Sequence, residues 1–428
     1  MSRYDSTVDT EEDVAEFSPI PATPATPATL ASLGLSVVRD DPAFRLQRKL
    51  GLIPKTGFGI VRRALFFSLL AWLPIALWAA WMGRAVADTA GEPLLAHFGI
   101  HIRFLVAVPL LILAEGVVHS VSERLLPRFV TTGIVPADQV PAMQLLVARL
   151  ARLRDAILPW LAILAIVIAV VTVADMVHLA HEIDWARDAG PGISTSTSAS
   201  TSTSSGLGFG ALWFLYVGRP IYLVLLLGWV WRLVLLFLLF RGIARLRLAL
   251  VPTHPDRAGG LGFLARFPAA FAPVLLAISA VMSAMLAHDV VYHGASVRSF
   301  QFQMALFGVI SVLMFLLPMF AFAGPLARAK RQALLEYGAL VGEHGRLVHQ
   351  RWIEGKRVGE QKLLDAPELG PVADVAALFS AVQAMRPVPI SMASVVPLLL
   401  AAVLPMLVVV ALEVPIGQLL TRVVKALL

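Results

Sequence analysis

Histidine and acidic side chains gather at the ends of several long apolar segments of this chain. Six of the ten histidines lie there, and the pairs His97/His101, Asp289/His293, Asp175/His178 and His178/His181 have spacings of three or four residues that place two side chains on one helix face. They are His97, His101, His178, His181, His288 and His293, accompanied by Asp175, Glu182, Asp184 and Asp289. Imidazole with carboxylate can bind zinc, iron or manganese, and protonation at about pH 6 would make a pH sensor. Chance accumulation of polar residues at helix ends explains the same pattern.

A second candidate site is the stretch from Pro252 to Leu264, which reads PTHPDRAGGLGFL. Its glycines would let backbone N–H groups approach a small anionic ligand. The residues of this candidate ligand site are His254, Asp256, Arg257, Gly259, Gly260 and Gly262. The stretch is neither a P-loop nor a dinucleotide fingerprint, because no Gly-Lys-Ser/Thr follows it and no strand precedes it. The alternative is a tight turn in which Asp256 caps the next helix and Arg257 pairs with a carboxylate.

Charged residues also lie within the apolar segments, where burial in hydrocarbon makes each a functional candidate. Among them are Arg103, Glu115, Arg219 and Arg232. Glu115 and Arg232 fall at similar depths in different segments, which predicts an ion pair between them. Such a pair is either a structural lock or part of a gate or substrate site.

The elements that must position these residues are long apolar runs. Seven are found, at 64–83, 100–121, 157–180, 211–240, 269–288, 303–324 and 394–412. About 20 apolar residues are needed to cross roughly 30 Å of hydrocarbon. With 58% hydrophobic residues and a mean hydropathy of +0.79, the chain is predicted to be an all-α integral membrane protein with about seven transmembrane helices. Six remain possible, because Pro397 and Pro405 interrupt the last run and a half-membrane hairpin would fit it.

The distribution of Lys and Arg predicts the orientation. They concentrate at 39–63, 124–154, 241–266 and 328–386, whereas the intervening gaps hold one each: Arg84, Arg187 and Arg298. The positive-inside rule therefore places the N-terminus in the cytoplasm. The net charge of +7 then reflects contact with anionic lipid and gives no reason to expect nucleic acid.

Composition also predicts the domain organisation. Residues 1–38 form an acidic, Pro-Ala-Thr-rich tail, and 39–324 form a six-span bundle with a cytoplasmic helix at 137–156 and a flexible outside loop at 182–210. Residues 325–393 form a cytoplasmic helical segment, and 394–428 contain the last span and an amphipathic tail. The chain has no cysteine, which excludes disulfides, Cys-ligated zinc and thiolate catalysis, and no cofactor is predicted.

The 252–264 stretch resembles the hallmark of a group of uncharacterised bacterial multispanning membrane proteins. Further similar signatures are Ala114-Glu115 with the basic helix after it, Trp229-x-Trp231-Arg232, Glu336-Tyr337-Gly338 and Met385-Arg386-Pro387-Val388-Pro389. The resemblance covers most of residues 100–428 and implies a bacterial inner-membrane location. It implies no activity, because that group has none assigned.

Two classes of function follow from these features. The first is a transporter or channel-like protein for a small solute or ion, favoured by the buried charges and the proline-interrupted last span. The second is a regulatory or interaction protein that binds a partner or a small anion at its cytoplasmic face. A metal-binding or pH-sensing site at the outer face is a further alternative, and a membrane enzyme is less favoured. The sequence does not indicate an oligomeric state.

Overall fold

The computed structural model describes residues 36–54, 57–86, 93–177, 208–356 and 370–413, with the backbone alone for 173–177 and 370–373. Within these ranges the chain is helical and contains no strand. Seven helices are long and apolar enough to cross a membrane, so the predicted all-α membrane bundle is confirmed. Their bounds are Ile60–Trp81, Phe98–Thr131, Ala137–Thr172, Phe209–Ile243, Leu261–Tyr292, Val297–Trp352 and Met392–Glu413.

Most of these spans consist of shorter helices joined end to end. The first and last are single helices, α3 (Ile60–Trp81) and α16 (Met392–Glu413). The second contains α4 (Phe98–His101), η2 (Ile102–Ala107), α5 (Val108–Leu125) and α6 (Arg128–Thr131). The third contains α7 (Val140–Asp155) and α8 (Leu158–Val177), and the fourth contains α9 (Phe209–Trp213), η5 (Phe214–Gly218) and α10 (Arg219–Ile243). The fifth ends in α11 (Ala272–Tyr292), and the sixth joins α12 (Val297–Leu316) through η8 (Leu317–Phe322) to α13 (Ala323–Trp352).

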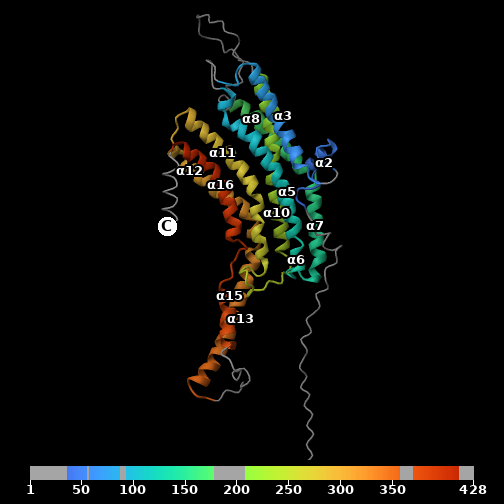
Figure 1. Ribbon diagram of the computed structural model, residues 1–428. Coiled ribbons are helices and arrows are strands. Elements are labelled where there is room, and N and C mark those ends of the chain that lie inside the picture. The colour runs from blue at the N-terminus through green and yellow to red at the C-terminus, as the bar shows by residue number, and fades with distance from the viewer. Residues whose placement is uncertain (1–35, 55–56, 87–92, 178–207, 357–369, 414–428) are drawn as a thin grey trace, which may run out of the picture.

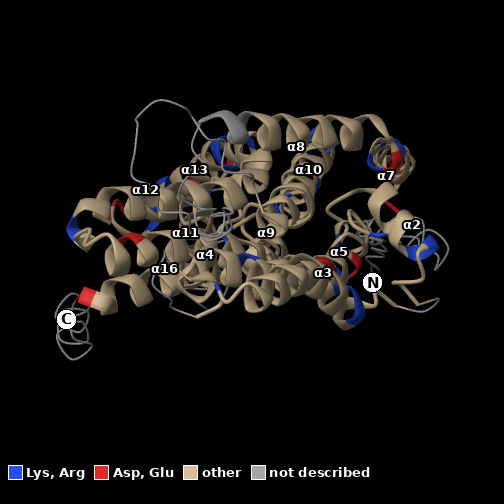
Figure 2. Ribbon diagram, turned by 90° about the horizontal axis from the view of Figure 1, so that it is seen from above, with Lys and Arg blue, Asp and Glu red and all other residues tan. Residues whose placement is uncertain are grey.

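The central helices of the bundle are α5, α10 and α11, which carry the largest share of buried side chains. Helix α11 packs against α16 and α5, while α10 packs against α8 and α7. Seen along the bundle, α12 and α16 lie on one side and α2 (Pro42–Lys49) and α7 on the other (Figure 2). Figure 1 shows α13 and α15 (Gly370–Gln383) projecting below the bundle as an arm. We call the end with α6, α7 and this arm the basic end, and the opposite end, with His97 and His288, the histidine end.

Two short π-helical segments interrupt the second and fourth spans, and each comes directly before a proline. η2 precedes Val108-Pro109, and η5 precedes Arg219-Pro220. Proline donates no hydrogen bond, and its ring clashes with the carbonyl four residues earlier, so the preceding turn widens. Both segments are turned toward each other, since Phe104 of η2 contacts Gly218 of η5 so closely that a Cβ on Gly218 would lie 2.6 Å from the ring.

The final span is one continuous helix despite the two prolines. α16 runs for 22 residues through Pro397 and Pro405, long enough to cross, which excludes a half-membrane hairpin within 392–413. It is held to α11 by the Ser279 hydroxyl, which donates to the Ala402 carbonyl at 2.6 Å.

The packed region begins earlier than the sequence predicts. Ser36, Val37 and Val38, assigned above to the N-terminal tail, are buried. The Ser36 carbonyl accepts from Arg154 at 2.6 Å, and its hydroxyl lies 2.8 Å from His119 Nδ1. The rest of the predicted tail, most of the 182–210 loop and residues 414–428 lie outside the described residues.

Candidate functional site

The glycine-rich stretch at 252–264 folds as a turn around its own aspartate. Asp256 accepts hydrogen bonds from the backbone N–H groups of Ala258 at 2.7 Å, Gly260 at 3.2 Å and Gly262 at 2.7 Å. His254 Nδ1 lies 3.0 Å from the same carboxylate. The backbone N–H groups that were predicted to bind an external anion therefore donate to the Asp256 carboxylate of the same stretch. This arrangement agrees with the alternative prediction of a tight turn.

Positive backbone φ angles in this turn are not confined to the glycines. Gly259 and Gly260 adopt positive φ of 63° and 92°, as expected, but so does Arg257 at 56°. Gly262 serves a steric purpose instead, because a Cβ there would lie 2.7 Å from Cβ of Asp256. The Arg257 side chain is exposed and forms no ion pair with any described carboxylate.

The turn is joined to a distant segment that the sequence analysis had singled out separately. The backbone N–H of Arg386 donates to the Arg257 carbonyl at 2.7 Å, and the Arg386 guanidinium donates to the Asp256 carbonyl at 3.2 Å. Lys330 of α13 donates to the Met385 carbonyl at 2.6 Å. The PTHPDRAGGLGFL and MRPVP stretches thus form one structural unit that ties the arm to the bundle.

The Asp256 carboxylate gives this turn a testable pH dependence. Burial would raise its pKa, but the three backbone hydrogen bonds together with His254 outweigh burial and lower the pKa below its ordinary value of 3.8. Stability from the ionised form is then complete above that value and lost as pH falls through the lower, folded value. We expect Asp256→Asn to lower Tm most above about pH 5, with the difference from wild type shrinking below about pH 3.8.

Thermal unfolding in detergent across this pH range checks the expectation. Asp138→Asn, at an exposed aspartate before α7, is the matched control and should leave Tm nearly unchanged. A Tm difference for Asp256→Asn that is constant from pH 3 to pH 7 (roughly the span around the ordinary pKa) would contradict it.

The predicted ion pair between Glu115 and Arg232 is confirmed, with 2.8 Å between its nearest atoms. It belongs to a larger network, because Glu115 also pairs with Arg63 at 2.5 Å and Arg232 pairs with Asp41 at 3.0 Å. All four side chains are at most 4% exposed. Two carboxylates and two guanidiniums balance, so the network is neutral as a unit. We call Asp41, Arg63, Glu115 and Arg232 the charge network.

The charge network joins helices that are far apart in the sequence. Asp41 is the N-cap of α2, where its second oxygen accepts from the Phe44 N–H at 2.7 Å. Arg63 lies in the first turn of α3, Glu115 in the middle of α5 and Arg232 in the middle of α10. The short helix α2 is therefore held against the bundle through its capping residue. Burial is the largest influence on Asp41 and raises its pKa, against the attraction of Arg232.

Sequence reasoning missed Asp41 as a member of the charge network and counted Arg63 only as a topology signal. Both residues precede the first apolar run, so no span depth could be assigned to them. The one sequence signal was Asp41-Pro42, an N-cap residue followed by proline at the first helical position.

The other two arginines predicted within the apolar segments lie nearer the histidine end. Arg103 is buried, and its guanidinium lies 5.6 Å from the ring centre of Phe214 and 5.8 Å from that of Tyr222. Arg219 is the half-buried first residue of α10. Both arginines therefore lie within or directly beside the paired π-helical segments, a type of helix distortion frequent at functional sites.

The histidine pairing differs from the prediction. His97 does not share a helix face with His101, because His97 precedes α4 with a non-helical backbone (φ −81°, ψ 75°). Its ring stacks instead on His288, with ring centres 5.1 Å apart. His101 accepts from the indole of Trp72 at 2.9 Å and lies 3.0 Å from the Leu94 carbonyl.

The Asp289–His293 pair predicted at the end of the fifth span is present at 3.5 Å. His293 also lies close to His288, with ring centres 5.3 Å apart. His178 and His181 lie outside the described residues. Among the residues that are described, no group of three or more His, Asp or Glu side chains could hold a metal ion.

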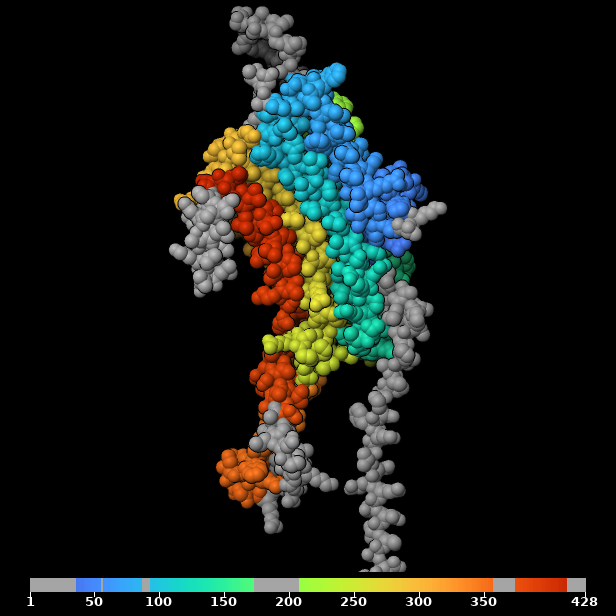
Figure 3. Space-filling view, in the orientation of Figure 1, coloured from blue at the N-terminus to red at the C-terminus, as the bar shows by residue number. Residues whose placement is uncertain are grey.

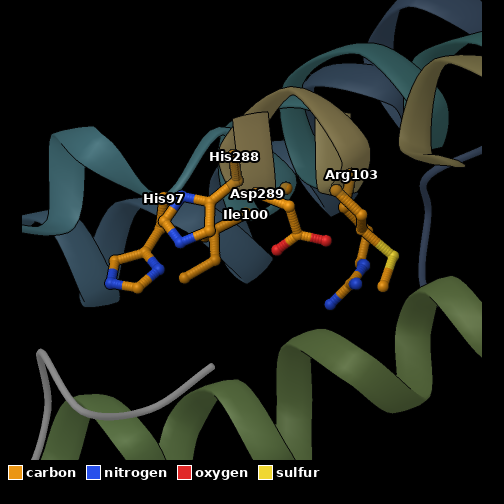
Figure 4. A pocket seen from close by; sticks show the side chains of 7 residues that line it. His97, Ile100, Arg103, His288 and Asp289 are labelled. Carbon is orange, nitrogen blue, oxygen red and sulfur yellow. The ribbon is translucent and has the colours of Figure 1, made fainter. Parts of the chain in front are cut away.

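A cavity of about 180 Å³ opens at the histidine end and brings several of these residues together. Its polar lining residues are His97, Arg103, His288 and Asp289. Figure 4 shows the two imidazole rings beside each other, with Asp289 and Arg103 extending from the same side. Gly99, Ile100 and Met285 complete the lining. We call this space the histidine-end cavity.

The fold places the chain in the class of multi-pass, all-α integral membrane proteins. Comparison with protein-family models, with curated proteins and with solved structures finds no match for this chain. Any function must therefore be argued from its own residues.

Proposed function

We propose that the protein transports a small anionic solute across a bacterial inner membrane, with the basic end in the cytoplasm. The orientation is supported by the concentration of Lys and Arg in alternate connections. The bacterial inner membrane is supported by the resemblance of the 252–264 and 385–389 stretches to bacterial multispanning proteins.

The observation that carries this proposal is the histidine-end cavity with a buried arginine in its wall. A guanidinium inside a membrane protein is costly and usually serves a substrate or ion pathway. Here Arg103 is joined by His97 and His288, which become cationic when protonated, and by one carboxylate, Asp289, which pairs with His293. With the histidines protonated the cationic groups outnumber this carboxylate, so the cavity then favours an anion. At about 30 Å³ per water molecule, 180 Å³ holds about six waters or a solute of comparable size.

We infer that two packed layers separate this cavity from the basic end. Trp229, Phe271 and Phe315 form the first, with ring centres 5.9 Å and 5.5 Å apart between neighbours. The charge network forms the second, where Asp41 links α2 to α10. Alternating access would require both layers to separate, so α2 would act as the movable part of a cytoplasmic gate.

Solute flux into proteoliposomes tests this function, with radiolabelled chloride, inorganic phosphate and lactate as probes. We expect wild type to carry at least one of them, and Arg103→Gln to lower that uptake by about 10- to 100-fold through loss of a charged hydrogen-bond donor. Arg298→Gln, at an exposed arginine of the same end, is the matched control and should keep wild-type uptake. Absence of flux for all three probes, or equal uptake by wild type and Arg103→Gln, would contradict the proposal.

Partner binding through the arm is the second candidate function. It is favoured by three large apolar side chains that are exposed on or beside α13: Leu335 (76%), Trp352 (72%) and Ile353 (73%). If proteoliposomes show no flux, crosslinking from Trp352 in intact membranes becomes the next experiment. No crosslinked species above the single chain would then exclude this function as well.

A further inference from the structure

A second, larger hollow lies on the outside of the bundle, between the start of α3 and one face of α5. It measures about 540 Å³ and is open along its length. The lining is apolar except at one end. It consists of Phe58, Gly59, Ile60 and Val61 on one side and Leu113, Gly116, Val117, Ser120, Val121 and Arg124 on the other. We call it the α3–α5 groove.

Helix geometry fixes how this groove lies relative to the membrane. α3 is a span that begins at Ile60, and the Ile60 side chain rests directly on Gly116, where a Cβ would lie 2.4 Å away. Gly116 therefore marks the level on α5 at which the first candidate span begins. Arg124 lies eight residues further along α5, about 12 Å at roughly 1.5 Å per residue. Its Nε–H donates back to the Ser120 carbonyl, so the guanidinium lies at about the level of Ser120, in the head-group region.

The two ends of the groove differ in chemistry as the two parts of a lipid do. Val61 and Leu113 are 72% and 43% exposed, so this end of the groove offers apolar surface to an acyl chain. At the other end the Nε–H of Arg124 donates to the Ser120 carbonyl at 2.9 Å, and the guanidinium is exposed. It forms no ion pair with a described carboxylate, since the neighbouring Glu123 pairs with His119 at 3.2 Å.

Gly116 has no side chain, which lets Ile60 at the start of α3 pack directly against α5. Figure 3 shows the N-terminal residues (blue) packed along the second span (cyan to teal) on this face. Ile60 occupies the space over Gly116, and α3 runs from there toward the histidine end, away from Arg124, so Phe58 and Gly59, which precede α3, complete this side of the groove. Arg62, next to Val61 in the sequence, is also exposed and adds a second positive charge near this region.

We propose that the α3–α5 groove binds one anionic phospholipid of the leaflet at the basic end. An acyl chain lies along Ile60, Leu113 and Val117, and the phosphate accepts hydrogen bonds from the Arg124 guanidinium. A zwitterionic lipid would fit the apolar part equally well but would add a positive charge beside the arginine. The selectivity for an anionic head group therefore depends on Arg124. This site is independent of transport at the histidine-end cavity.

Lipid binding to the purified full-length protein in detergent tests this site. Phosphatidylglycerol and phosphatidylcholine with identical acyl chains are titrated, with native mass spectrometry for stoichiometry and thermal stabilisation for affinity. We expect one tightly held phosphatidylglycerol, and an affinity for it that Arg124→Gln lowers about tenfold, to the level of phosphatidylcholine.

The matched control is Arg331→Gln on α13. Arg331 is also exposed and also donates from Nε to the carbonyl four residues earlier, Ala327, but lies off the groove. It should leave phosphatidylglycerol binding unchanged. Val117→Phe fills the apolar part and should weaken both lipids equally.

Three results would contradict the proposal of a lipid site in this groove. One is equal affinity of wild type for the two lipids, and another is an equal loss in Arg124→Gln and Arg331→Gln, which would indicate diffuse surface charge. The third is stabilisation by glycerol 3-phosphate that equals that by phosphatidylglycerol and depends on Arg124. That outcome would identify a site for soluble phosphates in place of a lipid.

Discussion

Replacing Glu115 by glutamine is expected to destabilise the folded protein by about 3–5 kcal/mol, the usual cost of removing one partner from a buried ion pair. Glu115 is the only carboxylate that contacts both Arg63 and Arg232 in the charge network. Without it the two guanidiniums share a single negative charge, Asp41, which reaches only Arg232. Arg63 would then keep one neutral acceptor, the Gln47 side chain at 2.5 Å.

Unfolding by SDS or heat in detergent measures this loss. Glu123→Gln is the matched control, because Glu123 lies two turns further along α5 with 51% of its side chain exposed, and surface changes cost less than about 0.5 kcal/mol. The double variant Glu115→Gln, Arg63→Gln restores neutrality and should recover part of the stability. Equal effects of Glu115→Gln and Glu123→Gln would mean that the charge network does not hold the bundle together.

The confirmed parts of the fold are those that depend on composition and on the position of a residue along an apolar run. Seven apolar helices could be predicted from run length alone, and the Glu115–Arg232 pair followed because both residues lie inside runs whose direction the basic residues define. Asp41 could not be placed in the same way. It lies in a short polar segment with no span of its own, so only the packing of α2 decides whether it meets Arg232.

Local turn chemistry was predictable where the partners are close in sequence. Asp256 accepts from the N–H groups of its own turn, which agrees with the tight-turn interpretation of the glycine-rich stretch, but the predicted pairing of Arg257 with a carboxylate is absent among the described residues. Its contact with Arg386 was not foreseeable, because 130 residues separate the two. The His97–His101 pairing failed for a related reason. The rule for helix faces assumes continuous helix, whereas the helix begins only after His97.

Replacing Asp41 by asparagine is expected to release α2 from the bundle while the spans stay folded. The side chain of Asp41 performs two tasks at once, capping α2 through the Phe44 N–H and neutralising Arg232. Asparagine still caps a helix well, so the capping term changes little. The negative charge that faces Arg232 is lost. We expect this loss to lower the local stability of α2 by about 3 kcal/mol, or about 100-fold in amide protection.

Hydrogen exchange resolves this local effect from global unfolding. Amides of α2 should exchange about 100-fold faster in Asp41→Asn, while those of α11, which has no part in the charge network, should keep wild-type protection. The adjacent Asp40 offers a matched control. It is 46% exposed, pairs with Arg48 at 3.3 Å on the surface, and has a positive φ of 70°, which asparagine tolerates. Asp40→Asn should therefore leave α2 protected.

The two possible outcomes for Asp41→Asn separate a movable gate from a fixed lock. If α2 alone loses protection, the charge network is the joint at which this helix can leave the bundle, as alternating access at the basic end requires. If α10 and α5 lose protection together with α2, the network holds the bundle as one cooperative unit, and opening must occur elsewhere. An unchanged α2 would show that its anchoring comes from Ser36 and the buried Phe44 ring, with the Asp41 charge contributing little.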